Sequence, residues 1–348
     1  MSRFMSSRLS TLKPYTPGEQ PRGREYIKLN TNESPFPPSE NVIKAVNSAA
    51  VSELRLYSDP ECTELREAIA RYTGYQSKNI FVGNGSDEVL SFLFMAYGDN
   101  GVTYPSVSYG FYKVYCDLYG LEKHEKALRE DFTICPDDYI GGKSLKVIAN
   151  PNAPTGMALG TDEIERIVRE NPDSVVVIDE AYVDFGAESA VGLVKNYPNL
   201  AVVQTFSKSR SLAGARLGFC VASEALTDDL NRIKYSNNPY NINRLTLIAG
   251  KAAIEDREYF EKCRREIIRV RELFSQQLIE RGFAVLKSSA NFVFAKSPEI
   301  GGKELYLRLK EKGFLIRHFD SDGISDYNRI TIGLEDDMRS LISAIDSL

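Results

Sequence analysis

The stretch Thr205-Phe-Ser-Lys-Ser-Arg-Ser-Leu-Ala-Gly-Ala-Arg-Leu-Gly-Phe219 is the one around which the rest of the chain is organised. It follows an apolar run, Leu200 to Val203, that is typical of a buried strand. Lys208 stands between two serines, and Arg216 follows eight residues later, flanked by glycines at 214 and 218. Glycines allow the backbone to turn tightly and to approach a bulky group. The stretch therefore predicts a nucleophilic lysine with charged partners beside it.

Strand-like and helix-like segments alternate on both sides of this stretch, from about residue 79 to about residue 225. Such a βαβ succession predicts an α/β fold with a parallel sheet. Beyond it, the pattern predicts a smaller α+β domain, with helices over 255–281 and near 304–312 and short strands over 291–295, 314–316 and 329–332. We place an arm and substrate-rim segment at 1–38, a large domain at 39–245 and a small domain at 246–348.

Composition narrows the classes of function. The 348 residues are enough for two domains, and a net charge of −5 argues against a nucleic-acid surface as the main role. No apolar run approaches the length of a membrane span. Five scattered cysteines without a CxxC pair indicate free thiols in a reducing cytoplasm. With only two histidines, a His-based triad or His-rich metal centre is excluded, and no metal is predicted.

The first 38 residues read as irregular chain. Residues 1–10 contain two arginines, several serines and no acid, which predicts a short disordered or exchanged arm rather than a transit peptide. Residues 14–21 are rich in proline and glycine, so we expect an extended arm that lies on another part of the molecule. Residues 29–38 form either a plain loop or the rim of a substrate site.

A glycine turn precedes a predicted helix at Phe81-Val-Gly-Asn-Gly-Ser-Asp-Glu-Val89. Ser86 is a good helix cap, and Asp87 suits the first turn. Amide N–H groups exposed together at a helix start are a seat for phosphate, although such turns are also common without any ligand.

Polar and aromatic side chains follow several of the predicted strands. Tyr109 precedes a glycine and would either lie flat over a planar ligand or pack in the core. Asp179 ends the buried run that begins at Val175, where a carboxylate pairs with a cation in a dry pocket or caps a helix. Tyr182 would face the same side. Arg317 and Arg329 lie at the ends of two strands and either converge on one anion or are solvated.

Taken together, these features describe one ligand. It carries a phosphate, a planar ring, a ring nitrogen to be kept protonated, a phenolic oxygen and a carbonyl carbon that a lysine attacks. Gly85, Ser86, Ser207 and Arg216 would bind the phosphate, and Tyr109 would lie on the ring. Asp179 would meet the ring nitrogen, Tyr182 the phenolic oxygen and Lys208 the carbonyl carbon. That ligand is pyridoxal phosphate.

The chain resembles the class I/II aminotransferases of fold type I over nearly its whole length. The motifs that carry the resemblance are Tyr15-Thr-Pro-Gly-Glu-Gln, Leu29-Asn-Thr-Asn-Glu-Ser-Pro, Tyr57-Ser-Asp-Pro, Gly85-Ser-Asp-Glu, Ser108-Tyr-Gly-Phe-Tyr, Pro154-Thr-Gly, Asp179-Glu-Ala-Tyr, Ser207-Lys with Arg216, and Arg329-Ile-Thr-Ile-Gly. Within this family the chain is most similar to the branch that exchanges the amino group between histidinol phosphate and 2-oxoglutarate, a step of histidine biosynthesis.

The resemblance implies a large domain with a seven-stranded, mostly parallel sheet, and a homodimer whose subunits share the active sites. It implies that Lys208 holds the cofactor and carries a proton, with Asp179 on the ring nitrogen and Tyr182 on the phenolic oxygen. Asp87 joins the cofactor-binding set, and Tyr57 reaches the cofactor phosphate of the partner subunit. Substrate contacts are assigned to Tyr15, Asn32, Arg317 and Arg329.

One position departs from the family pattern. The usual motif in the proline turn is Asn-Pro-Thr-Gly, and its asparagine donates to the phenolic oxygen of the cofactor, whereas this chain has Ala153 there. The adjacent Asn152 either substitutes for it or points in another direction, and in the second case the phenolic oxygen of the cofactor would be less stabilised.

Four other interpretations are kept. Two are enzymes that share the fold, an aromatic-amino-acid aminotransferase and a threonine-phosphate decarboxylase. A third is a binding or regulatory protein that has the same fold but no activity. The intact set of Lys208, Asp179, Tyr182 and Arg216 argues against the last of these. A dinucleotide-binding dehydrogenase is disfavoured because no GxGxxG follows a first strand.

Overall fold

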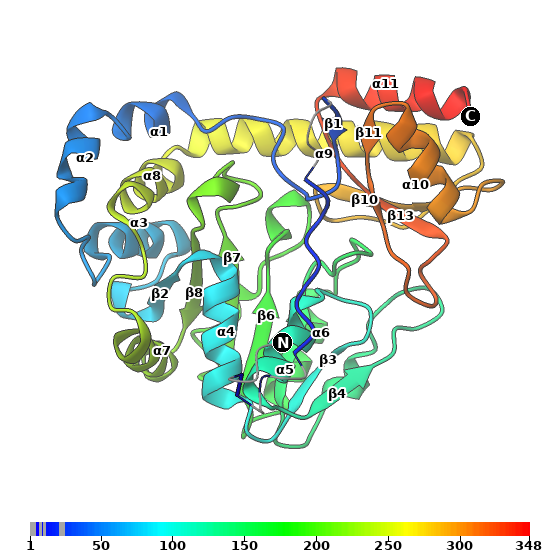
Figure 1. The fold of residues 1–348 in the computed structure, drawn as a ribbon. Coiled ribbons are helices and arrows are strands. Elements are labelled where there is room, and N and C mark those ends of the chain that lie inside the picture. The colour runs from blue at the N-terminus through cyan, green and yellow to red at the C-terminus, as the bar shows by residue number, and fades with distance from the viewer. Residues whose placement is uncertain (1–4, 7–8, 10–11, 21–24) are drawn as a thin grey trace.

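A computed structural model describes residues 5–6, 9, 12–20 and 25–348 (Figure 1). The prediction for residues 1–10 therefore falls largely outside the described residues. Residues 12–20 form no helix or strand, in keeping with the extended arm expected there.

A seven-stranded sheet forms the centre of the larger part of the molecule. Its spatial order is β2-β8-β7-β6-β5-β3-β4, and β8 runs opposite to the other six strands. The mostly parallel sheet predicted from the sequence is confirmed. The strands are β2 (Ile80–Gly83), β3 (Val102–Pro105), β4 (Lys123–Lys126), β5 (Leu145–Ala149), β6 (Val176–Asp179), β7 (Leu200–Thr205) and β8 (Gly218–Ala222).

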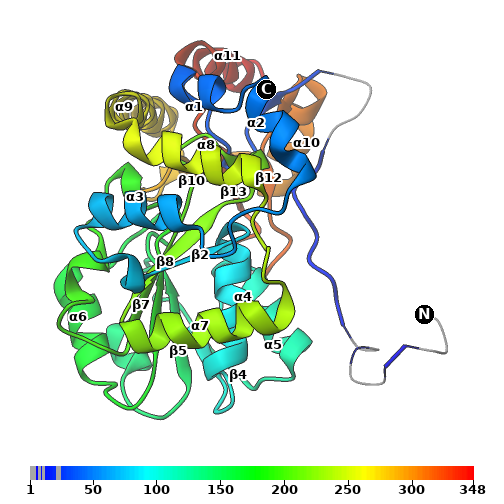
Figure 2. The same cartoon turned by 90° about the vertical axis from the view of Figure 1, so that its left-hand side faces the viewer.

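Helices cover both faces of this sheet, and the strand residues alternate between two cores (Figure 2). Ile148, Ile178 and Val202 pack with α3 (Thr63–Thr73), α6 (Thr161–Arg169) and α8 (Arg244–Glu255). Val147, Val177 and Val203 pack with α4 (Gly85–Tyr97), α5 (Phe111–Tyr119) and α7 (Glu224–Asn237). Burial on both faces explains why these strands are continuous apolar runs.

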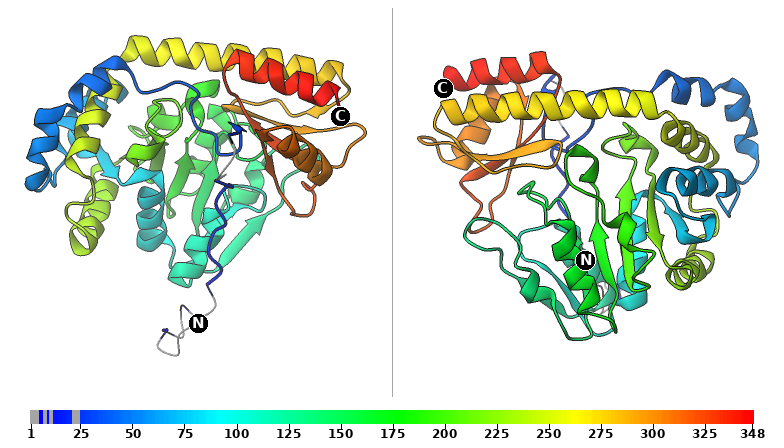
Figure 3. Two further views of the ribbon diagram at one scale, coloured as in Figure 1. Left: turned by 45° about the horizontal axis from the view of Figure 1, so that its top comes forward. Right: turned by 180° about the vertical axis from the view of Figure 1, so that it is seen from behind.

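A second sheet of four antiparallel strands, ordered β12-β13-β10-β9, forms the C-terminal part. Its strands are β9 (Ala284–Val285), β10 (Phe292–Lys296), β12 (Arg317–His318) and β13 (Tyr327–Thr331), and its helices are α10 (Gly302–Glu311) and α11 (Glu335–Asp346). The long helix α9 (Arg257–Glu280) spans from α8 to this sheet (Figure 3). The predicted inward row of α9 is buried, at Cys263, Ile267, Val270, Phe274 and Leu278.

The N-terminal segment belongs by pairing to the C-terminal part, because β1 (Ile27–Lys28) pairs in parallel with β11 (Phe314–Leu315). The chain then crosses to α1 (Glu40–Ala45) and α2 (Ser48–Ser52). These are two separate helices, because Asn47 caps the second by accepting from the amides of Ala49 and Ala50. The predicted domain boundary at residue 245 falls inside α8, which packs on α1 and α3.

Short 3-10 helices complete the described structure, at η2 (Glu53–Arg55), η3 (Ser77–Asn79), η4 (Pro136–Tyr139), η5 (Val183–Phe185), η6 (Ala190–Leu193) and η7 (Ala213–Ala215). In the part of the chain that the structure describes, no helix has both the length and the apolar character to cross a membrane.

Candidate active site

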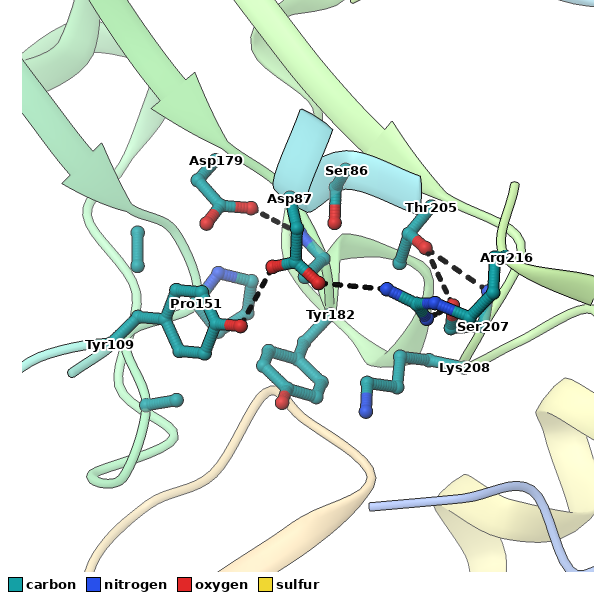
Figure 4. A pocket seen from close by; sticks show the side chains of 13 residues that line it. Ser86, Asp87, Tyr109, Pro151, Asp179, Tyr182, Thr205, Ser207, Lys208 and Arg216 are labelled. Atoms are coloured by element: carbon teal, nitrogen blue, oxygen red, sulfur yellow. Dashed lines mark hydrogen bonds and ion pairs between the residues drawn. The ribbon is translucent and has the colours of Figure 1, made fainter. Parts of the chain in front are cut away.

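A cavity lies at the edge of the large sheet where the parallel strands end (Figure 4). In a sheet of this kind the carboxyl ends of the parallel strands form the ligand-binding edge. Eight residues predicted for the site line this cavity, namely Ser86, Asp87, Tyr109, Asp179, Tyr182, Ser207, Lys208 and Arg216. Segments far apart in the sequence thus meet because their strands are neighbours in the sheet.

The first turn of α4 closes one side of the cavity. Ser86 was expected to cap this helix, but the cap position is Asn84, which makes no side-chain cap bond, and Ser86 lies within the first turn. Gly85 has a positive φ of 79°, and a Cβ there would lie 2.7 Å from the Arg216 guanidinium. A Cβ at Gly218 would lie 2.3 Å from the Ser86 amide nitrogen. Both glycines are therefore required for the close approach of this helix start to Arg216, where amides and a cation make an anion seat.

Arg216 is held in that seat by an acid. Its Nη2 lies 2.7 Å from Asp87 Oδ2, and its Nη1 donates to the Ser207 hydroxyl at 3.5 Å. The other oxygen of Asp87 accepts the Tyr109 hydroxyl at 2.7 Å. Asp87 therefore orients both the cation of the anion seat and the aromatic ring above the cavity, and a bound phosphate would share Arg216 with it.

Lys208 follows β7 and reaches the boundary between this cavity and a second one, since it lines both. Its Nζ donates to the backbone oxygen of Thr31 at 3.1 Å and lies 5.7 Å from the centre of the Tyr182 ring. The Tyr182 hydroxyl accepts from Asn32 Nδ2 at 2.9 Å. The amine is thus held at the position where two ligands would meet.

Asp179, the last residue of β6, is buried at the far side of the cavity. Its Oδ2 accepts the Tyr112 hydroxyl at 2.7 Å and its Oδ1 accepts the amide of Ala181 at 3.3 Å. Burial raises the pKa of Asp179 to about 6, while the hydrogen bond from Tyr112 acts in the opposite direction. A carboxylate that is desolvated in this way favours a cationic partner.

The second cavity, of about 450 Å³, adjoins the first and is lined by all four predicted substrate residues, Tyr15, Asn32, Arg317 and Arg329. The two arginines are direct neighbours on the antiparallel strands β12 and β13. Arg329 Nη2 donates to the backbone oxygen of Asn30 at 2.9 Å, but its buried Nε has no partner among the described residues. Burial lowers the pKa of Arg329. An incoming anion would satisfy both the charge and the free donor.

The arm passes over this second cavity. Tyr15 packs on Phe111, with ring centres 4.7 Å apart, and Arg317 donates to the backbone oxygens of Thr16 and Pro17 at 3.4 Å. Glu19 is bound by Lys310 Nζ and by the Tyr306 hydroxyl, each at 2.8 Å. The arm is therefore fastened to α10 on one side and rests on α5 on the other.

Asn152 does not face the first cavity. Its side-chain oxygen accepts the Ser108 hydroxyl at 2.7 Å, and its Nδ2 donates to the Val107 oxygen at 3.0 Å and to Thr155 at 3.2 Å. It lines a separate pocket, whereas Ala153 lines the first cavity. In this structure Asn152 therefore points away from the first cavity, because adjacent residues of the turn point in different directions.

Tyr57 lies on the surface, away from the cavity of its own chain. It is 79% exposed and stacks on Tyr240 with ring centres 4.5 Å apart. A role toward the cavity of the same chain does not fit this position.

Sequence reasoning missed several residues of the site. Thr205, Ala149, Pro151 and Ala181 line the first cavity at or just after the ends of β5, β6 and β7. Their position after predicted strands was the available signal. Tyr112 and Glu19 were missed because their partners, Asp179 for one and Lys310 for the other, are distant in sequence, and no local pattern predicts such contacts. Among the described residues, no group of three or more His, Cys, Asp or Glu side chains is placed to hold a metal ion.

Comparison with known proteins adds independent findings. Residues 24–345 match the family model described as aminotransferase class I and II. Histidinol-phosphate aminotransferase of Brachyspira hyodysenteriae is 49% identical over 348 residues, covering 99% of this chain and 98% of that protein. Histidinol-phosphate aminotransferase 1 of Bordetella parapertussis is 50% identical over 350 residues, with coverages of 99% and 98%.

A solved structure supports the fold. Histidinol-phosphate aminotransferase from Sinorhizobium meliloti, in complex with pyridoxal-5'-phosphate, aligns with a TM-score of 0.90 and 23% identity, covering 100% of this chain and 98% of that one. At this identity the likeness concerns the fold alone.

Proposed function

The chain belongs to the class I and II aminotransferases, and on that basis we propose that it exchanges the amino group between L-histidinol phosphate and 2-oxoglutarate, with pyridoxal phosphate as cofactor. One observation carries the choice of substrate. Relatives that are 49% and 50% identical over almost their whole length are histidinol-phosphate aminotransferases. An aromatic-amino-acid aminotransferase and a threonine-phosphate decarboxylase are the alternatives, because they share the fold.

The first cavity fits the proposed cofactor. Arg216, Ser207 and the amides at the start of α4 would hold the phosphate, and Tyr109 would cover the ring. Asp179 would pair with the ring nitrogen, since its buried carboxylate has no cation within hydrogen-bonding distance among the described residues. Tyr182 would meet the phenolic oxygen without the usual asparagine, since Ala153 offers no donor.

When bound, pyridoxal phosphate supplies an aldehyde that combines with amines and a ring that accepts an electron pair from the substrate carbon. The chain supplies the rest. Lys208 Nζ would hold the cofactor and yield that place to the substrate amine, and from the junction of the cavities it would move a proton to and from the substrate carbon. Asp179 would keep the ring nitrogen protonated, which would stabilise that electron pair.

The second cavity fits the two anionic substrates. Histidinol phosphate offers a phosphate and glutamate offers carboxylates, and Arg329 with its unpaired Nε would bind either. Arg317 is its strand neighbour and holds the arm, so it would assist from the rim. Tyr15 and Asn32 line the same cavity and would complete the enclosure of the substrate.

A homodimer with shared active sites is part of the proposal. Tyr57 is 79% exposed, and the segment just before it exposes the apolar side chains of Val51, Leu54 and Leu56. A short segment that exposes several large apolar side chains is typical of a contact surface. We place Tyr57 at the cofactor phosphate of the partner subunit.

The test is a screen of single half-reactions. The protein loaded with pyridoxal phosphate is mixed in turn with histidinol phosphate, phenylalanine and threonine phosphate, and the visible absorbance of the bound cofactor and the release of carbon dioxide are followed. We expect histidinol phosphate to remove the absorbance fastest, with no carbon dioxide. The Lys208→Ala variant should bind substrate and yield no ketone, because proton transfer contributes about 100-fold or more to the rate.

Two results would contradict the proposal. Carbon dioxide released from threonine phosphate would make the protein a decarboxylase, and a faster reaction with phenylalanine would make it an aromatic aminotransferase. Turnover by Lys208→Ala at the native rate would remove Lys208 from the chemistry.

A further inference from the structure

Tyr112 contacts Asp179, the proposed partner of the cofactor's ring nitrogen, from outside the cavity. It lies on α5, is completely buried, and does not line the cavity. Its hydroxyl donates to Asp179 Oδ2 at 2.7 Å, across 67 positions of sequence. Since Asp179 carries no proton when ionised, the phenol is the donor and the carboxylate the acceptor.

The Tyr112 ring is held so that its hydroxyl has one direction. Tyr104 and Tyr109 contact it edge to face, with ring centres 5.9 and 5.6 Å away, and Phe94 stacks on it at 6.0 Å. A ring packed against three others has little freedom to turn its hydroxyl elsewhere. The hydrogen bond to Asp179 is therefore a fixed feature of the fold.

The electrostatic surroundings show what this bond does. Burial raises the pKa of Asp179 to about 6, and the hydrogen bond from Tyr112 opposes that rise. Of the charged groups that face Asp179, Asp87 on α4 raises its pKa and Lys208 lowers it. Burial also holds the pKa of Tyr112 well above its usual range, so the phenol keeps its proton and remains a donor.

We propose that Tyr112 is a positioning residue for Asp179, which keeps that carboxylate ionised and fixes its plane for a cationic ring nitrogen. This inference rests on the proposed function, because it presumes that pyridoxal phosphate occupies the cavity. Tyr112 does not line the cavity, and its hydroxyl acts through its hydrogen bond to Asp179. Its effect is therefore confined to the ring nitrogen, and it should not alter how the phosphate or the aldehyde is held.

The experiment compares two ligands that differ only at that nitrogen. The dissociation constants of pyridoxal phosphate and of its analogue with CH in place of the ring nitrogen are measured by equilibrium dialysis with cofactor-free protein at neutral pH. Wild type should prefer pyridoxal phosphate. Tyr112→Phe should lower that preference about 10-fold, the effect of removing one hydrogen bond to a charged group. Asp179→Asn should abolish it, and adding Tyr112→Phe to Asp179→Asn should change nothing more.

Tyr104→Phe is the matched control. Tyr104 is also buried and packs on Tyr112, but its hydroxyl is directed to Glu125, at 3.4 Å, and away from the cavity. It should keep the wild-type preference. If Tyr112→Phe leaves the preference unchanged, the inference is overturned. If both ligands also bind more weakly by the same factor, Tyr112 is merely structural. Failure of wild-type protein to bind pyridoxal phosphate at all would instead refute the proposed function.

Discussion

The two adjoining cavities are built in different ways. In the first, the charged side chains already have partners, since Asp87 holds Arg216 and Tyr109, and Tyr112 holds Asp179. In the second, the buried Nε of Arg329 and the buried Oδ1 of Asn30 have no partner among the described residues. Buried polar groups are normally satisfied. The first cavity is therefore a preorganised seat, and the second awaits a ligand that completes it.

The origin of the two cavities explains this difference. The first is formed by turns at one edge of a single sheet, so the sheet fixes their positions. The second joins the arm, the segment near Asn30 and the strands β12 and β13, with contacts such as Asn32 to Thr331 that span 299 positions. A site assembled from separate parts can exchange substrates while the cofactor seat stays unchanged.

The largest effect is expected in the first cavity, from Asp179→Asn in the cofactor-free protein. The folded state raises the pKa of Asp179 to about 6. In wild type, protonated Asp179 therefore contributes to the free energy of unfolding below about pH 4. This contribution is lost as the pH rises through about 6, which lowers the free energy of unfolding by about 3 kcal/mol. Asparagine does not titrate. The free energy of unfolding of the variant, relative to wild type, should rise by that amount between about pH 4 and about pH 7 in urea titrations.

Glu180 serves as an internal reference in that measurement. Burial raises its pKa to about 7 in the same region, and it is present in both proteins, so its contribution cancels in the difference. If the free energy of unfolding changes with pH in the same way in wild type and in Asp179→Asn, then Asp179 is not desolvated in solution. The first cavity would then not exclude water from this carboxylate.

In the second cavity, Arg329→Gln should slow both half-reactions by roughly 30-fold, since one partner of a desolvated charge pair is lost. Single-turnover rates with histidinol phosphate and with glutamate measure this. Arg317→Gln is the matched comparison and should cost less, because Arg317 also donates to the arm and lies closer to the rim. A loss limited to one substrate would show that the two anions do not share Arg329.

The smallest effect is expected where the arm is fastened. Glu19→Gln removes the ion pair with Lys310, so Tyr15 should be held less firmly over the second cavity. Because the pair is largely exposed, the KM for histidinol phosphate should rise about 3-fold with kcat unchanged. Glu304→Gln removes a different ion pair of α10, with Arg308, and should leave KM as in wild type. Equal KM values for both variants would mean that the ion pair between the arm and α10 does not affect substrate binding.

Much of this molecule could be predicted from the sequence. Motifs at the ends of predicted strands identified the aminotransferase family, which the comparisons confirm, and eight of the residues that line the first cavity. These predictions succeed because strand order and turn chemistry are local properties, and a parallel sheet brings successive turns to one edge. The direction of a single side chain within a turn is not local, and for that reason the sequence left open whether Asn152 faces the first cavity.

The order of the residues is enough to identify a set of chemical groups: a lysine, a buried carboxylate, an anion seat and two arginines at strand ends. The way in which each group is held depends on the folded packing. Tyr112 meets Asp179, Glu19 meets Lys310, and Arg329 is left with a free donor, through packing between segments distant in sequence. Such contacts depend on side-chain directions and on which groups burial deprives of water, and neither follows from residue order alone.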